Sequence, residues 1–161
     1  MATTHDLRGT RGTQNTHDAH DSPQGELVLR TLAMPADTNA SGDIFGGWLM
    51  AQMDIGGAIF ARDIARGRVV TVHVDSMTFK RPASVGDVVC CYARCLKRGT
   101  TSVTVAVEVW IKKESGEPFG QRYPATNATF TYVAVDAHGK PRPLPLPPSA
   151  EIPNPKIPNP K

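Results

Sequence analysis

Hydrophobic and polar positions change their period twice along the middle of the chain. Residues 26–34 (ELVLRTLAM) alternate in part and are followed by Pro35, a pattern typical of a strand that ends in a loop. From Ile44 to about Ile64 the large apolar residues recur at spacings of three to seven, on more than one face of a helix. We therefore expect a helix that the rest of the protein largely buries and that Gly67 ends.

Four segments rich in β-branched and aromatic residues follow this helix. They are 69–79, 88–96, 102–113 and 125–135, and the connections between them contain glycine, proline or both. Because these connections are too short for crossover helices, we expect the later strands to be antiparallel neighbours. The pattern predicts an α+β fold in which about five antiparallel strands curve around one long helix. Such a sheet keeps free edges, which favours an obligate dimer that pairs them.

Composition separates one compact segment from two unusual ends. Nine of the 14 prolines follow residue 140, three of the five histidines precede residue 21, and all ten aromatic residues lie between. Residues 1–24 are polar and unpatterned, which predicts a disordered tail. Residues 146–161 end in a tandem IPNPK repeat and should form an extended tail, either a spacer or a docking peptide. One domain is therefore expected at 25–145.

Charge and cysteine content disfavour several classes of function. Residues 25–140 carry 13 Lys and Arg against 11 Asp and Glu, which argues against a nucleic-acid partner and leaves a smaller anionic ligand open. The cysteines, Cys90, Cys91 and Cys95, have neither zinc-site spacing nor an even number, so we expect reduced strand residues and no metal site. Without a long apolar run, the sequence predicts a cytoplasmic protein with no membrane partner.

Glycines at the start of the predicted helix are the first candidates for chemistry. Gly46 and Gly47 fall in its first turn, where each glycine costs about 1 kcal/mol relative to alanine. The free amides there suit a carbonyl oxygen that becomes an oxyanion, but the glycines could equally serve only to let a strand pack closely. His73 and His138 are expected on a sheet face and in a turn, so a two-histidine relay is not expected.

Two aspartates and one asparagine lie in or near the same helix. Asp43 precedes it and is interpreted as its N-cap. Asp54 lies in mid-helix among apolar residues, where an isolated carboxylate is costly. It therefore carries chemistry, points to solvent, or pairs with a base such as Arg62. Asn39, in the loop before the helix, could orient a water or a carbonyl, although asparagine is also an ordinary turn residue.

The same residues resemble a known family. The segments LRTLAMPADTNASGDIFGGWLMAQMDIGGAIFA, GRVVTV, RPASVGDVVCCYARC, VEVWIKK and TFTYVAVD, in this order, are very similar to YciA-type acyl-CoA thioesterases of the hot-dog fold. The resemblance covers nearly all of residues 26–145. It implies a central helix wrapped by the sheet, dimers with a continuous sheet, a homo-oligomer that is a trimer of dimers, and active sites at the dimer interface.

The resemblance also implies hydrolysis of acyl-CoA to a fatty acid and coenzyme A, with no cofactor beyond that substrate and product. The family's catalytic aspartate matches Asp54, and its loop asparagine matches Asn39. Because the leaving thiol has a pKa of roughly 8.5, one base and oxyanion donors are sufficient. We expect Asp54 to act as general base or, alternatively, as nucleophile, Asn39 to position water or substrate, and the Gly47 amide to polarise the thioester carbonyl.

Phosphates of coenzyme A would explain the small basic excess. The candidate contacts are Gly46, Arg81, Lys97, Arg98, Thr100, Ser102, Lys112 and Lys113. Two other functions stay open: a non-catalytic hot-dog protein that binds or senses acyl-CoA, and an acyl-thioester dehydratase. The dehydratase is disfavoured because such enzymes typically pair a carboxylate with a histidine, and the sequence offers none near the helix. The acyl-chain preference is not fixed by the sequence.

Overall fold

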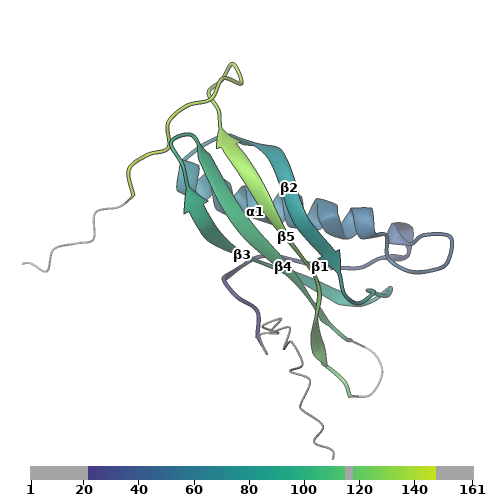
Figure 1. Ribbon diagram of the computed structural model, residues 1–161. Helices are drawn as coiled ribbons and strands as arrows, with labels where there is room; N and C mark the ends of the chain where they lie inside the picture. Colours follow the sequence, from purple (N-terminus) through teal and green to yellow (C-terminus); the bar gives the residue numbers. More distant parts are fainter. Residues whose placement is uncertain (1–21, 115–117, 148–161) are drawn as a thin grey trace, which may run out of the picture.

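One antiparallel sheet and one long helix make up the computed structural model, which describes residues 22–114 and 118–147. The strands are β1 (Glu26–Leu32), β2 (Val69–Phe79), β3 (Val88–Arg98), β4 (Ser102–Lys112) and β5 (Arg122–Ala134). A 3₁₀ turn, η1 (Pro35–Asp37), and helix α1 (Gly46–Ala65) connect β1 to β2. The helix lies against one face of the curved sheet (Figure 1), so the α+β architecture predicted from the sequence is confirmed.

Strand order in the sheet is β1-β3-β4-β5-β2, which leaves β1 and β2 at the two edges. The prediction that consecutive later strands are neighbours is correct for β3, β4 and β5 and wrong for β2, which pairs with β5. The connection 80–87 instead passes the end of the sheet. Its eight residues easily span the three strand spacings involved, about 14 Å.

Alternation along β4 explains how the sheet covers the helix. Val103, Val105, Val107 and Val109 are at most 1% exposed and belong to the core, whereas Thr104, Ala106 and Glu108 are only half-buried. Leu49, Met53, Ala61 and Ala65 of α1 complete the buried layer. The alternation of apolar and more polar residues along VTVAVEVW (103–110) therefore gives β4 one face in the core and a second, more polar face.

Burial of α1 is incomplete within a single subunit. Met50, Ile55 and Ile59 on the helix are between 39% and 49% exposed. Val72 and Phe79 on the edge strand β2 are more than half exposed. The expectation of a largely buried helix is thus met on one side only, and an apolar strip is left at the free β2 edge.

The ends of α1 differ in how well the sequence predicted them. The N-cap is Phe45 and makes no side-chain cap, so the interpretation of Asp43 as N-cap is wrong. Asp43 lies two residues too early because its backbone amide and carbonyl both bond to Asn39. At the other end, α1 ends at Ala65, two residues before the predicted stop at Gly67, whose amide donates to the Arg62 carbonyl.

Segments at the two chain ends fall largely outside the described residues. This applies to the tails predicted at 1–24 and 146–161, of which only 22–24, 146 and 147 are described. Leu144 packs against the core and donates its amide to the Thr100 carbonyl, so the chain still contacts the sheet there. Within the described part of the chain, no helix is long and apolar enough to cross a membrane.

Candidate active site

Asp54 lies half-buried in the third turn of α1, where two hydroxyl groups reach its side chain. The Thr71 hydroxyl donates a 2.7 Å hydrogen bond to Asp54 Oδ1. The Tyr132 hydroxyl lies 3.3 Å from the same oxygen and 3.1 Å from the Asp54 carbonyl oxygen. Both partners are neutral, so the alternative of an ion pair with Arg62 does not hold in the described structure.

The sheet register and a glycine bring these three residues together. Thr71 of β2 pairs directly with Tyr132 of β5, which puts both side chains on the sheet face that α1 covers. A Cβ on Gly57 would lie 2.3 Å from the Tyr132 hydroxyl, so only glycine lets that hydroxyl approach the helix backbone. Asp54 is a candidate from the sequence, whereas Thr71 and Tyr132 are not predicted from it. The MD-x-GG sequence around Asp54 was the one local sign of a close approach.

Burial and the nearby Asp54 carboxylate both raise the pKa of Tyr132 above its ordinary value. The phenol therefore stays protonated and acts as a hydrogen-bond donor. The Cys91 thiol, also on the core side of the sheet, has its pKa raised to about 12 by burial, with a further contribution from Cys90. A thiol that stays protonated is a poor nucleophile, so Cys91 is not a candidate for covalent catalysis.

Gly46 and Gly47 start α1, as predicted, and have different surroundings. A Cβ on Gly46 would lie 3.2 Å from the Phe79 ring, so that glycine is explained by packing against β2. A Cβ on Gly47 would meet nothing within 4 Å. Close packing thus accounts for Gly46 and does not account for Gly47. Helical geometry leaves both amides without an intrahelical acceptor, at the positive end of the dipole.

Asn39 lies in the loop that leads into α1 and organises that loop. Its side-chain oxygen accepts the backbone amides of Ser41 at 2.9 Å and Asp43 at 3.1 Å. Since the oxygen is occupied, the NH₂ group is the part of the side chain that can bind another molecule. Asn39 can thus donate to a water or a carbonyl, one of the roles considered from the sequence.

Asp54 and Gly47 do not meet within one subunit. They are seven residues apart on α1, about 10 Å along the helix axis. The amides of a helix also point toward its N-terminus, away from Asp54. A carbonyl bound at the Gly47 amide would therefore lie too far from Asp54 for water activated there to attack it.

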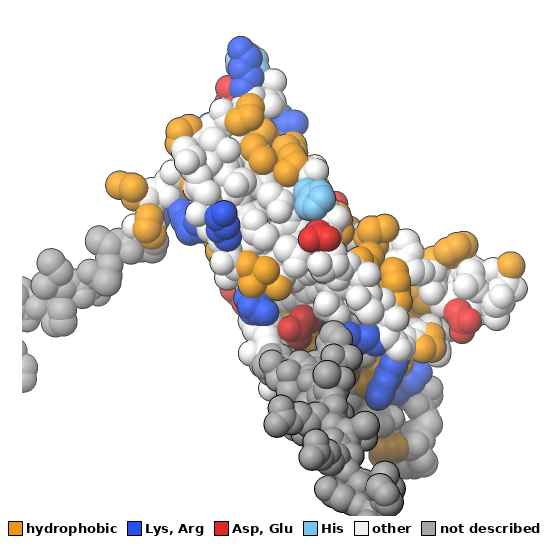
Figure 2. Space-filling model, in the orientation of Figure 1, with side chains coloured by type: hydrophobic (Ala, Val, Ile, Leu, Met, Phe, Trp, Pro, Cys, Tyr) orange, Lys and Arg blue, Asp and Glu red, His pale blue; other side chains and the backbone are white. Residues whose placement is uncertain are grey.

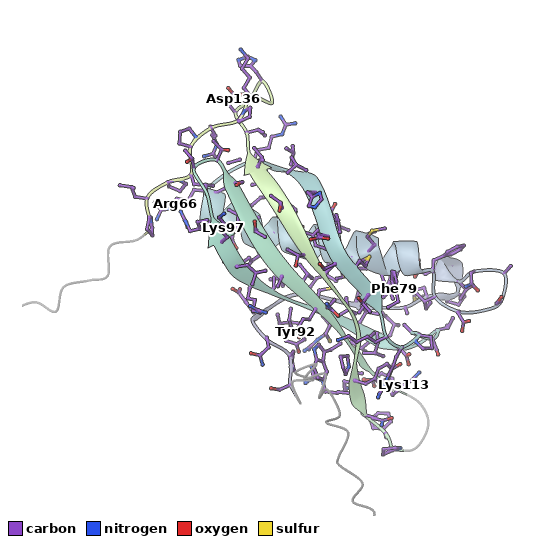
Figure 3. All side chains as sticks on the ribbon, viewed as in Figure 1. Arg66, Phe79, Tyr92, Lys97, Lys113 and Asp136 are labelled. Atoms are coloured by element: carbon purple, nitrogen blue, oxygen red, sulfur yellow. The ribbon has the colours of Figure 1, made fainter. Side chains whose placement is uncertain are left out.

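Candidate contacts for coenzyme A fall into two groups at opposite ends of the sheet. Lys97, Arg98, Thr100 and Ser102 surround the β3–β4 turn, whereas Lys112 and Lys113 end β4. The eleven residues of β4 separate the groups by about 30 Å, as the positions of Lys97 and Lys113 in Figure 3 show. Arg81 begins the β2–β3 connection, near Gly46, with which it lines a hollow of about 300 Å³.

Several of these cations already have partners within the chain. Lys113 forms a 2.8 Å ion pair with Asp87, which is 1% exposed, and the hydrogen bond raises the pKa of Lys113. Lys112 pairs with Glu114 on the surface. Arg98 donates to the Pro145 carbonyl at 2.6 Å. Arg81, an exposed residue, places its guanidinium over the Tyr123 ring, 5.4 Å from the ring centroid.

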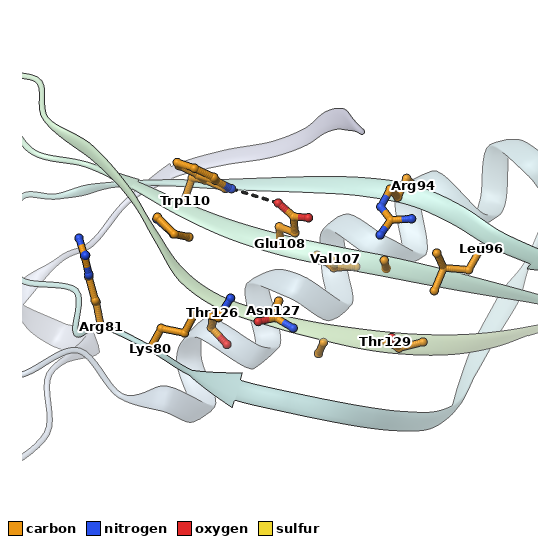
Figure 4. Close-up of a pocket in the computed structure, with 13 residues that line it drawn as sticks. Lys80, Arg81, Arg94, Leu96, Val107, Glu108, Trp110, Thr126, Asn127 and Thr129 are labelled. Carbon is orange, nitrogen blue, oxygen red and sulfur yellow. Dashed lines mark hydrogen bonds between the residues drawn. The ribbon is translucent and has the colours of Figure 1, made fainter. Parts of the chain in front are cut away.

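A hollow larger than the one beside Gly46 lies on the sheet face opposite to Asp54. It measures about 550 Å³ and is lined by residues of β3, β4 and β5, among them Arg94, Glu108, Trp110 and Asn127 (Figure 4). Figure 2 looks onto this face, where charged, polar and apolar side chains alternate. Asp54 is not among the residues that line this hollow. Residues 22–114 and 118–147 contain no cluster of three His, Cys, Asp or Glu able to hold a metal ion.

Comparison with known proteins identifies the family. The Thioesterase superfamily model matches residues 41–117. The acyl-CoA thioester hydrolase YciA of Salmonella typhimurium is 75% identical over 125 residues, which cover 78% of this chain and 94% of that one. The chain belongs to the YciA family of acyl-CoA thioester hydrolases. The fold is the hot-dog fold that the sequence resemblance implied.

Solved structures agree with this family and with the arrangement of the sheet and helix. A hexameric thioesterase from Yersinia pestis is 74% identical, with a TM-score of 0.75, over 78% of this chain and 100% of that chain. A solved hexameric broad-specificity acyl-coenzyme A thioesterase is 62% identical, also with a TM-score of 0.75, over 78% of this chain and 84% of that chain.

Proposed function

We propose that this protein hydrolyses acyl-CoA thioesters to a carboxylic acid and free coenzyme A in the cytoplasm. The observation that carries the proposal is the Asp54 carboxylate, held half-exposed by the Thr71 and Tyr132 hydroxyls on a helix that begins with two glycines. A carboxylate fixed by neutral donors keeps its charge available to accept a proton. The high identity to named acyl-CoA thioester hydrolases supports the same reaction.

The proposed mechanism needs one base and one set of oxyanion donors. Asp54 takes a proton from water, and the resulting hydroxide equivalent attacks the thioester carbonyl carbon. The Gly47 amide stabilises the oxyanion of the tetrahedral intermediate, and Asn39 positions water or the carbonyl through its NH₂ group. The intermediate collapses when the carbon–sulfur bond breaks and the coenzyme A thiolate leaves. Attack by Asp54 itself, through an anhydride, is the alternative covalent route.

The site is proposed to form between two subunits. Since Gly47 and Asp54 of one helix cannot act on one carbonyl, Asp54 of one subunit works with Gly47 and Asn39 of the other. Pairing of two β2 edges would continue the sheet and cover the apolar strip that includes Val72 and Ile59. Two solved relatives are hexamers, and we extend that assembly, as a trimer of dimers, to this chain.

We propose Arg81 as the contact for a coenzyme A phosphate near the start of α1. It is an exposed residue and lines the 300 Å³ hollow with Gly46 and Phe79. Lys112 and Lys113 lie at the same end of the sheet, although Lys113 is held by Asp87. The group around Lys97 and Arg98, with Thr100 and Ser102, would reach a substrate bound there only from another subunit.

Thiol release from acyl-CoA tests the function directly. The wild-type protein should release one thiol per acyl-CoA consumed, and an acetyl, butyryl, hexanoyl and palmitoyl series gives the chain preference. Asp54→Asn should lower kcat by roughly 10²–10⁴-fold, because the base is lost while the shape is kept. Asp63→Asn changes an exposed aspartate of the same helix and is the matched control. Stoichiometric binding of acyl-CoA without thiol release would instead indicate a binding protein.

A further inference from the structure

The hydroxyl group that reaches Asp54 from β5 belongs to a residue that is otherwise part of the core. Tyr132 is 0% exposed, and its ring stacks on Phe130 at 6.1 Å with an interplanar angle of 13°. Its hydroxyl faces two acceptors on one residue, the backbone carbonyl and Oδ1 of Asp54. Because packing fixes the whole Tyr132 ring, its hydroxyl can hold the flexible Asp54 carboxylate in one orientation.

We propose that Tyr132 is a positioning residue that fixes the Asp54 carboxylate for catalysis, and that Gly57 keeps open the space its hydroxyl needs. This inference rests on the thioesterase function proposed above. Thr71 and Tyr132 both bind Oδ1, so Oδ2 is the carboxylate oxygen left to accept the proton of water. The two donors thereby assign different roles to the two oxygens of one side chain.

Gly57 is retained at a cost to the helix. A glycine inside a helix is less favourable than alanine by about 1 kcal/mol. A Cβ at this position would lie 2.3 Å from the Tyr132 hydroxyl oxygen and 3.1 Å from the ring carbon that bears it. A methyl group would therefore push the hydroxyl away from Asp54. The raised pKa of Tyr132 keeps the donated proton in place across the pH range of an activity assay.

The test is the pH dependence of kcat for Tyr132→Phe. The variant keeps the ring and loses the hydrogen bond, so kcat should fall roughly tenfold while KM changes less than about twofold. Because the variant lacks a donor that stabilises the charged carboxylate, the acid limb of the profile should move to higher pH. An unmoved acid limb with wild-type kcat would overturn the proposal.

Tyr123→Phe is the matched control for the loss of a buried hydroxyl from β5. The Tyr123 hydroxyl donates to the Pro82 carbonyl at 2.9 Å and does not contact Asp54. This variant should lose stability but keep the acid limb of the wild type. If both variants leave that limb in place and lose only thermal stability, Tyr132 is a structural residue and the proposal fails.

Gly57→Ala provides a second and independent variant. Alone, it should shift the acid limb in the same direction as Tyr132→Phe, because the methyl displaces the hydroxyl. Combined with Tyr132→Phe, it should lower kcat little further, since the hydroxyl is already gone. Fully additive effects would contradict the proposal. All these outcomes presuppose an active wild type, so absent thiol release refutes the proposed function and is distinguishable from failure of the positioning role.

Discussion

The four glycines of α1 serve different purposes, and only the structure separates them. Gly46 makes room for Phe79, and Gly56 for Val28, whose methyl would lie 2.9 Å from an added Cβ. Gly57 makes room for a hydroxyl, whereas Gly47 faces open space within its own subunit. In sequence, the two glycine pairs look equivalent. Packing within the subunit therefore does not require glycine at position 47, which is consistent with the proposed role of its amide.

Gly47→Ala should separate stability from activity. The added methyl meets no atom of its own subunit and replaces a helical glycine, so the free energy of unfolding should rise, by up to about 1 kcal/mol. The thioester carbonyl must approach the amide closely, so kcat/KM should fall by roughly tenfold or more. Thermal unfolding and thiol release measure the two effects on one preparation.

Gly56→Ala is the control for this change. Its methyl would lie 2.9 Å from Val28 Cγ2, closer than such atoms normally approach, so it should lower stability instead of raising it. A Gly47→Ala variant with wild-type kcat/KM would show that its amide does not bind the substrate oxygen.

At this scale the sequence identified the charged candidate and missed its neutral partners. Asp54 is recognisable because a carboxylate among apolar helix residues needs a reason. Thr71 and Tyr132 are separated from it by 17 and 78 residues. Threonine and tyrosine are also ordinary strand residues, so nothing local marks them. Only the pairing of β2 with β5 under the helix brings the three together.

Among the elements, the connection 80–87 between β2 and β3 is held by one buried carboxylate. Asp87 accepts the Ser84 amide at 2.8 Å and Lys113 Nζ at 2.8 Å. The connection also binds the segment just before α1, because the Ile44 amide donates to the Ala83 carbonyl. The segment that leads into α1 and the end of β4 are thus linked through this connection.

Lys113→Met should lower the free energy of unfolding by about 2 kcal/mol, because it leaves the buried Asp87 carboxylate without its cation. Lys112→Met is the matched control. Lys112 and Glu114 form a pair whose side chains are 41% and 35% exposed, and such a pair contributes less than about 1 kcal/mol. Urea unfolding at fixed protein concentration measures both. Equal losses for the two variants would contradict this description of the connection.

Element positions were predictable from hydrophobic period, and element roles were not. The bounds of β2 and the start of β4 match the pattern, because β-branched alternation and glycine-containing turns are local signals. The place of β2 in the sheet depends on the path of the connection 80–87, which its sequence does not predict. The pairing of Lys113 with Asp87 is likewise not visible in the sequence. A lysine at the end of a strand has the same local sequence whether it binds a phosphate or a buried carboxylate.

At the scale of the whole molecule, the proposed site consists of two halves on each subunit. Under the proposed mechanism, the base is Asp54 and the oxyanion donor is the Gly47 amide, about 10 Å apart on one helix. The unpaired β2 edge and the exposed apolar residues beside it are the surface through which we propose that a second subunit completes both halves. A free sheet edge was expected from the strand count, but which edge it is, and that Asp54 faces it, required the strand order.

Mixed oligomers test the shared site most directly. Asp54→Asn subunits and Gly47→Val subunits, each inactive alone, are co-expressed with different tags, and mixed particles are purified. Under the proposed arrangement, a mixed dimer has one intact site, with Asp54 from one subunit and Gly47 from the other. Random pairing should then restore about a quarter of wild-type thiol release. Mixed particles that stay as inactive as the two parents would contradict a site formed between subunits.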